Sequence, residues 1–147
     1  MRNILVALDF STGTGAVITV ASELVRALAA DCWLLHVAAP DPEFVGYEVG
    51  PQSVRDQVAT EMRGEHRELH EHAERMRAGG LRVTALQVQG PTVEKILHEA
   101  QRLQVDLIVI GSHGHGVLHR ALLGSVSEGV LRGATCPVLI VPAGKDG

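Results

Sequence analysis

Apolar residues follow two alternating patterns along this chain. Short continuous apolar runs predict buried strands, and apolar residues that recur every three to four positions predict amphipathic helices. Strands are therefore expected over 4–8, 33–37, 81–88, 106–110 and 138–141. Helices are expected over about 15–29, over 53–78, from Pro91 onward and after Ser125. Prolines and glycines between 38 and 51 predict a loop.

The longest predicted helix has a signal at each end and one apolar stripe. Ser53, with Asp56 three residues later, resembles a capping box with Asp in place of Glu. Gly79 and Gly80 end the helix, because glycine is the usual residue in the left-handed position after a helix. The residues predicted for its buried stripe are Val54, Val58, Met62, His66, Leu69, Ala73 and Met76.

Apolar strands joined by helices predict a parallel sheet that is covered on both faces. Right-handed crossovers favour a doubly wound arrangement. We therefore expect an α/β fold in one domain over 1–147, a Rossmann-like, five-stranded parallel sheet with strand order 3-2-1-4-5 along the chain. Such sheets bind ligands outside the carboxyl ends of the strands, where the winding direction switches. Here that point lies between the strands that end at Asp9 and Gly111.

Composition narrows the classes of partner and compartment. The formal net charge is -4, which argues against a nucleic-acid partner held through its phosphates. No apolar run approaches the length that crosses a bilayer. Residues 1–4 lead directly into a strand and leave no room for a signal peptide. We therefore expect a cytoplasmic protein with neither a membrane nor a nucleic-acid partner.

The two cysteines, Cys32 and Cys136, are not part of a CxxC pair, which suits a reducing cytosol. In the predicted strand order their strands lie three spacings apart, roughly 14 Å. That separation is too large for a disulfide. We therefore expect two buried, unreactive thiols.

The segment 111–127, GSHGHGVLHRALLGSVS, carries the clearest chemical signal. It follows an apolar strand and places two glycines, a spacer of nine residues and then Gly124-Ser125 at a helix start. Glycines let the backbone approach a ligand closely, and the N–H groups at a helix start favour an anion. A P-loop is excluded because no lysine follows a suitable glycine, and a dinucleotide fingerprint fails at Ile18 and at His119. The segment therefore predicts a phosphate site of another kind.

This pattern, G-2x-G-9x-G-S from Gly111 to Ser125, resembles the nucleotide-binding signature of the universal stress protein family. The resemblance covers the whole chain and includes the runs 4–9, 36–37 and 136–142. It implies an adenine nucleotide α-hydrolase-like fold that binds ATP with Mg²⁺. The residues that the resemblance assigns to the nucleotide are Asp9, Val37, Gly111, Gly114, Gly124, Ser125 and Ser127. We expect the neighbouring residues Leu8, His113, His115, Gly116 and Val126 to complete the nucleotide site.

The resemblance also implies a role for each part of this set. Glycines and hydroxyls between 111 and 127 hold ribose and phosphates, Asp9 lies near the nucleoside, and Val37 helps to enclose adenine. Asp9 is also the residue expected to reach a nucleotide-bound Mg²⁺. This chain has Asp9-Phe10-Ser11 where the family commonly has Asp-Gly-Ser, so its local turn can differ.

Two of these residues have structural alternatives. Ser125 and Glu128 form a capping box, so Ser125 can cap its own helix when no phosphate is bound. Asp9 can stabilise the turn that follows it instead of contacting ribose or Mg²⁺.

A dedicated metal site is not favoured for any of the histidines. His113, His115 and His119 lack the spacing of a standard ligand set. We expect them to flank a polyphosphate, with modest affinity that rises below about pH 6.5. His66 and His70 lie one helical turn apart, but His66 falls on the predicted apolar stripe and a structural role is expected.

We therefore expect an ATP-binding, cytosolic, nucleotide-responsive stress regulator rather than a fast enzyme, since no catalytic set of residues stands out. Two alternatives stay open. One is a nucleotide-free interaction module of the same fold, and the other is a slow ATPase in which Asp9 and a loop histidine activate water. The apolar last strand, Val138 to Val141, would be an exposed edge. We expect it to pair with a second copy, as family members commonly do.

Overall fold

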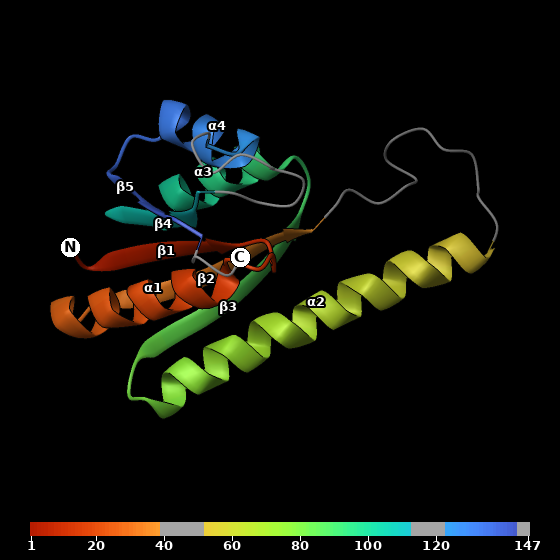
Figure 1. Cartoon of the computed structure of the whole chain (residues 1–147), viewed down its shortest axis with the longest axis horizontal. Helices are drawn as coiled ribbons and strands as arrows, with labels where there is room; N and C mark the ends of the chain where they lie inside the picture. The colour runs from red at the N-terminus through yellow and green to blue at the C-terminus, as the bar shows by residue number, and fades with distance from the viewer. Residues whose placement is uncertain (39–51, 113–122, 144–147) are drawn as a thin grey trace.

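The computed structural model describes residues 1–38, 52–112 and 123–143. Over these residues strands and helices alternate along the chain (Figure 1). The elements are β1 (Asn3–Leu8), α1 (Thr14–Leu28), β2 (Asp31–Ala38), α2 (Gln52–Ala78), β3 (Arg82–Gln89), α3 (Thr92–Arg102), β4 (Leu107–Gly111), α4 (Ser125–Gly133) and β5 (Val138–Val141). No helix among them is both long and apolar enough to cross a bilayer.

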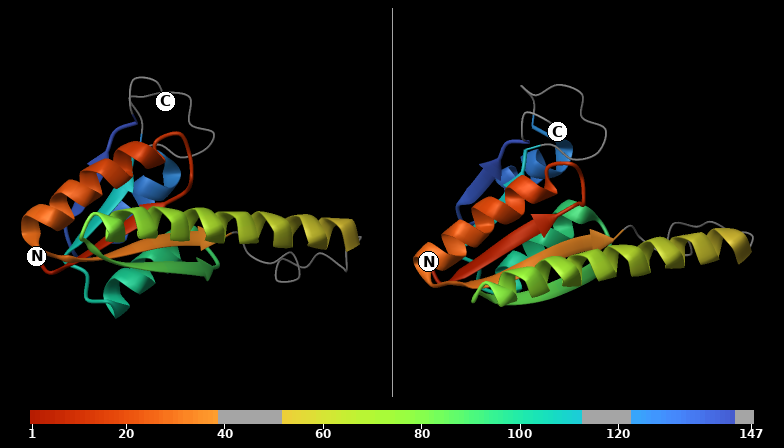
Figure 2. Two further views of the ribbon diagram at one scale, coloured as in Figure 1. Left: turned by 90° about the horizontal axis from the view of Figure 1, so that it is seen from below. Right: turned by 60° about the horizontal axis from the view of Figure 1, so that its bottom comes forward.

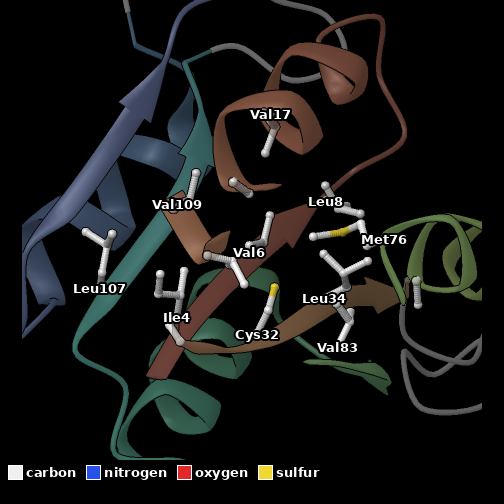
Figure 3. Close-up of a cluster of buried hydrophobic side chains, with 14 of the residues drawn as sticks. Ile4, Val6, Leu8, Val17, Cys32, Leu34, Met76, Val83, Leu107 and Val109 are labelled. Carbon is white, nitrogen blue, oxygen red and sulfur yellow. The ribbon is translucent and has the colours of Figure 1, made fainter. Parts of the chain in front are cut away.

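The strands form one parallel sheet in the order β3-β2-β1-β4-β5, which confirms the predicted doubly wound topology. Helices α1 and α2 cover one face, and α3 and α4 cover the other (Figure 1). Successive residues of a strand point to opposite faces. Ile4 and Val6 of β1 therefore belong to the core under α1 and α2 (Figure 3), whereas Leu5 packs with Ile96 of α3 and Val130 of α4.

Helix α2 is longer than the sheet that it covers. Its 27 residues span about 40 Å, whereas the 8 residues of β3 span about 26 Å. The first turns of α2 consequently extend past the carboxyl ends of the strands (Figures 1 and 2). The stripe residues that become buried are Leu69, Ala73 and Met76.

The rest of the predicted α2 stripe is not buried in the sheet interface. Val58 and Met62 are half-buried and His66 is exposed, so the prediction for His66 is wrong, while the side chain of Val54 lies outside the described set. Met62 and His66 lie beside the end of the edge strand β3, where their partners are the polar side chains of Gln87 and Gln89. Apolar periodicity gives the face of a helix but not how completely another layer covers it.

The structure describes the two predicted ends of α2 to different extents. The helix begins at Gln52, one residue before Ser53. The side chain of Ser53 lies outside the described set, so the capping box stays a prediction. At the other end Gly80 adopts a left-handed φ of 93°, and the N–H of Leu81 donates to the carbonyl of Met76 over 3.2 Å. This bond is the Schellman closure that the glycine pair predicts.

Candidate functional site

The carboxyl ends of β1, β2 and β4 and the first residues of α1 and α4 surround a cavity of about 280 Å³. This is the position at which doubly wound sheets bind ligands. The predicted site residues that line it are Leu8, Asp9, Val37, Gly111, Gly124, Ser125, Val126 and Ser127. The structure thus brings these residues together, and their roles toward a ligand stay predictions. His113, Gly114, His115 and Gly116 lie outside the described residues, as do residues 39–51 of the loop predicted over 38–51. Ala38 belongs to β2 instead.

Hydrogen bonds tie the end of β4 to the start of α4. The N–H of Gly124 donates to the carbonyl of Ser112 over 2.8 Å. The hydroxyl of Ser127 is buried and lies 3.1 Å from the same carbonyl and 2.9 Å from that of Gly124. Gly124 itself is extended, with φ −64° and ψ 158°. These contacts hold the first turn of α4 in a fixed position beside the sheet.

The first turn of α4 has no side-chain cap. Gly124 is the N-cap residue and Ser125 the first helical residue, so the predicted capping box is wrong. Glu128 instead pairs with Arg132 one turn later, over 2.6 Å. Among the described residues, none accepts a hydrogen bond from the backbone N–H of Ser125, Val126 or Ser127.

Three N–H groups that have no acceptor among the described residues, together with the positive end of the helix dipole, favour an anion at this turn. The described residues around the cavity include no lysine or arginine, and Asp9 is their only carboxylate. An anion here would therefore be held by backbone dipoles and hydroxyl groups rather than by fixed positive charge.

The loop after β1 contains Asp9, Phe10 and Ser11, which stand where the family commonly has Asp-Gly-Ser. The N–H of Ser11 donates to Oδ1 of Asp9 over 3.0 Å, which is the predicted turn-stabilising contact. Phe10 has a left-handed φ of 58°, the conformation that a glycine adopts without strain. Its ring packs against His36, with 4.5 Å between ring centroids, and stacks on His72 of α2 at 6.3 Å. The aromatic contacts therefore hold a glycine-like turn in a chain that lacks the glycine.

His36 is a buried polar residue at the end of β2 that also lines the cavity. Its Nδ1–H donates to the carbonyl of Leu8 over 2.9 Å, and its Nε2 pairs with the carboxyl group of Glu65 from α2. Both ring nitrogens are thus engaged within the protein. A histidine inside an otherwise apolar strand is the sequence feature that could have identified His36 as a site residue. Nothing in the sequence marks Glu65 as its partner.

The histidines of α2 contact one another and the neighbouring strand. The rings of His66 and His70 lie 4.3 Å apart, and Nδ1 of His66 is 2.8 Å from the amide oxygen of Gln87. Within the described part of the chain no three His, Cys, Asp or Glu side chains gather closely enough to hold a metal.

The cysteines differ in exposure. Cys32 is buried, and burial raises the pKa of its thiol to about 12. Cys136 is only half-buried, so its predicted burial is wrong, and its pKa is raised first by burial and then by the charge of Asp106. The difference arises because Cys136 comes before the edge strand β5, whereas Cys32 lies inside the sheet.

Comparisons with known proteins agree with this architecture. The model of the universal stress protein family matches residues 1–142. Universal stress protein YxiE of Bacillus subtilis is 32% identical over 145 residues, which cover 95% of this chain and 98% of that protein.

Solved structures show the same arrangement. The structure of hypothetical protein MJ0577, from Methanocaldococcus jannaschii, is 27% identical with a TM-score of 0.76, and the match covers 98% of this chain and 97% of that one. A universal stress protein from Archaeoglobus fulgidus in complex with dAMP shares the fold at 20% identity and a TM-score of 0.66, over 96% and 98% of the two chains. The chain belongs to the universal stress protein family.

Proposed function

We propose that this chain binds ATP together with Mg²⁺ in the cavity at the carboxyl ends of β1 and β4, and that it acts as a cytosolic, nucleotide-responsive stress regulator. The observation that carries the proposal is the uncapped first turn of α4, where the N–H groups of Ser125, Val126 and Ser127 lack acceptors among the described residues. Phosphate is the ligand chemistry that such a turn favours.

The arrangement of the lining residues supports an orientation for the nucleotide. A phosphate group would lie at the first turn of α4, and the ribose beside Asp9. The adenine would lie toward Val37, where Ile96 of α3 adds apolar surface. A universal stress protein of the same fold was solved with dAMP, which supports an adenine nucleotide as the class of ligand.

Mg²⁺ fits this site only as a partner of the nucleotide. Asp9 is the one carboxylate among the described lining residues, and no metal-binding cluster of three side chains occurs in the described ranges. Mg²⁺ is usually bound by one or two carboxylates together with substrate phosphates. Asp9 would therefore supply one oxygen ligand, and its charge would be balanced by the ion.

The edge strand β5 supports a further proposal, a two-fold homodimer. Among the described strands it pairs with β4 alone, and Val138, Leu139 and Ile140 are half-exposed. An apolar edge with free backbone groups invites another strand. A second copy of the chain would cover it.

The test of the nucleotide proposal is extraction of bound nucleotide from freshly purified protein, by heat or acid, with chromatographic identification. We expect about one ATP per chain. Recovery of ADP in its place would favour the slow ATPase, which steady phosphate release and its loss in Asp9→Ala would establish. Empty protein that also gives no calorimetric response to Mg-ATP at pH 6 and pH 7.5 would overturn the proposal and favour the nucleotide-free interaction module.

A further inference from the structure

One buried hydroxyl group has no hydrogen-bond partner within the described part of the fold. Thr14 is only 8% exposed, and among the side chains that the structure describes its Oγ1 is the one buried polar atom without a hydrogen bond. Buried polar groups are paired in nearly all native structures, and an unpaired one destabilises the folded state. A missing partner at this position therefore calls for an explanation.

The position of Thr14 suggests what that partner is. Thr14 is the first residue of α1, a helix of 15 residues whose N-cap, Gly13, provides no side-chain cap. The N–H of Thr14 donates to Ser11, and that of Val17 to Gly13. No described residue accepts from the N–H groups of the two residues between them, 15 and 16. The start of α1 thus repeats the uncapped, positive character found at the start of α4.

Both helix starts belong to the same cavity. Gly13 and Thr14 line it from α1, and Gly124 to Ser127 line it from α4. The two helices follow β1 and β4, which are neighbouring strands about 4.8 Å apart, and they lie on opposite faces of the sheet (Figure 1). A ligand at the carboxyl ends of these strands therefore meets two separate groups of donors.

We propose that the start of α1, with the hydroxyl of Thr14, is a second phosphate subsite, so that the cavity selects nucleoside polyphosphates over nucleoside monophosphates. This inference rests on the proposed nucleotide function and specifies its ligand class. One phosphate group occupies the turn of α4, and the next reaches the turn of α1 across the ends of β4 and β1. Threonine in a helix has two favourable χ1 wells, so Oγ1 can turn from its buried position to the ligand.

The carboxylate of Asp9 determines which form of the polyphosphate fits. Asp9 lines the same cavity and lies in the loop that leads into α1. Its negative charge repels a bare phosphate chain and favours one that carries Mg²⁺. The second subsite therefore accepts the magnesium complex, and chelation of Mg²⁺ should weaken ATP binding more than AMP binding.

The experiment compares Thr14→Val with Thr14→Ser. Valine keeps the branched shape and removes the hydroxyl, whereas serine keeps the hydroxyl and removes the methyl group. Thermal unfolding without ligand and calorimetric titration with Mg²⁺ and AMP, ADP, ATP or inorganic pyrophosphate are measured for each protein. We expect Thr14→Val to raise the unfolding temperature, because the unpaired hydroxyl is gone, and to reduce the preference for ATP over AMP about tenfold. Thr14→Ser should keep the preference.

Each other outcome is decisive. If the wild type binds ATP and Thr14→Val keeps its preference for ATP over AMP, the nucleotide function stands and the second subsite is wrong. If pyrophosphate binds the wild type and loses affinity in Thr14→Val while no adenine nucleotide binds better than pyrophosphate, the subsite stands and the adenine nucleotide function falls. If neither pyrophosphate nor any nucleotide binds the wild type, both are wrong.

Discussion

Replacement of Ser125 by proline tests the anion site at α4 with little risk to the fold. Proline lacks the backbone N–H but is well tolerated at the first position of a helix, where that N–H has no intrahelical acceptor. Ser125 holds this position, and Gly124 before it is extended at φ −64° and ψ 158°. That conformation is the one required of a residue that precedes proline. Ser125→Pro should therefore fold normally and lose one donor to the phosphate.

The size of the expected loss follows from that single donor. A hydrogen bond to a charged group contributes about 1.5–3 kcal/mol, which corresponds to roughly 10- to 150-fold in the dissociation constant. The fold itself should change little, because the N–H of Ser125 has no acceptor among the described residues. Calorimetric titration with Mg-ATP measures the affinity, and thermal unfolding followed by circular dichroism checks the helix.

Ser125→Ala is the matched control, because it removes the hydroxyl group and keeps the backbone N–H. If binding depends on the N–H, Ser125→Ala should retain most of the affinity that Ser125→Pro loses. A Ser125→Pro variant that folds and binds Mg-ATP as tightly as the wild type would refute the reasoning. The phosphates would then lie away from the first turn of α4.

Three further predictions concern other parts of the molecule. Leu139→Lys places a charge in the middle of β5 and should convert the proposed dimer to a monomer, as measured by sizing with light scattering. The control Leu28→Lys changes a 42% exposed leucine of α1 and should leave the dimer intact, and a Leu139→Lys variant that stays dimeric would rule out the interface. Burial raises the pKa of the Cys32 thiol to about 12, so Cys32 should react with maleimide at pH 7.5 only after denaturant is added. Intact mass measures the labelling, and equal labelling of Cys32 with and without denaturant would contradict its burial. The pKa of Asp106 is lowered from 3.8 by hydrogen bonds from the N–H groups of Asn3 and Arg2, so the carboxylate stabilises the fold above that pH and less as the pH falls through the lowered pKa. The difference in stability between the wild type and Asp106→Asn should therefore shrink from pH 5 to pH 3 in urea unfolding, and a constant difference would contradict the assignment.

The fold was predictable because the strands are continuous apolar runs, and because right-handed crossovers leave few topologies for a parallel sheet of this size. Errors arose where local pattern lacked three-dimensional context. His66 sits at the expected helical spacing yet is exposed, because it lies beside Gln87 on β3, the edge strand of the described sheet. Ser125 and Glu128 have the capping-box spacing, but Ser125 is the first helical residue after the N-cap Gly124, and Glu128 pairs with Arg132 at 2.6 Å.

In the candidate site, too, the topology was predictable from the sequence, whereas the local contacts were not. The rule for doubly wound sheets placed Asp9 and Gly111 at one cavity, and the structure has both there. Thr14 could not be predicted, because the Gly13-Thr14-Gly15 run signalled only an incomplete dinucleotide fingerprint. Its importance depends on the absence of a hydrogen-bond partner in the described structure, which no local sequence pattern encodes.

The left-handed backbone of Phe10 has a consequence for how mutations combine. Its φ of 58° is held by ring contacts with His36 and His72, so the cost of losing either histidine depends on which residue occupies position 10. With glycine there, the turn needs no aromatic support, and replacement of His72 by alanine should be close to neutral for the loop. With phenylalanine there, the same replacement removes a contact that maintains the loop beside the cavity. Positions 10 and 72 lie far apart in the sequence, on a loop and on α2, but their side chains are in contact. We therefore expect them to show epistasis and to vary together as this sequence evolves.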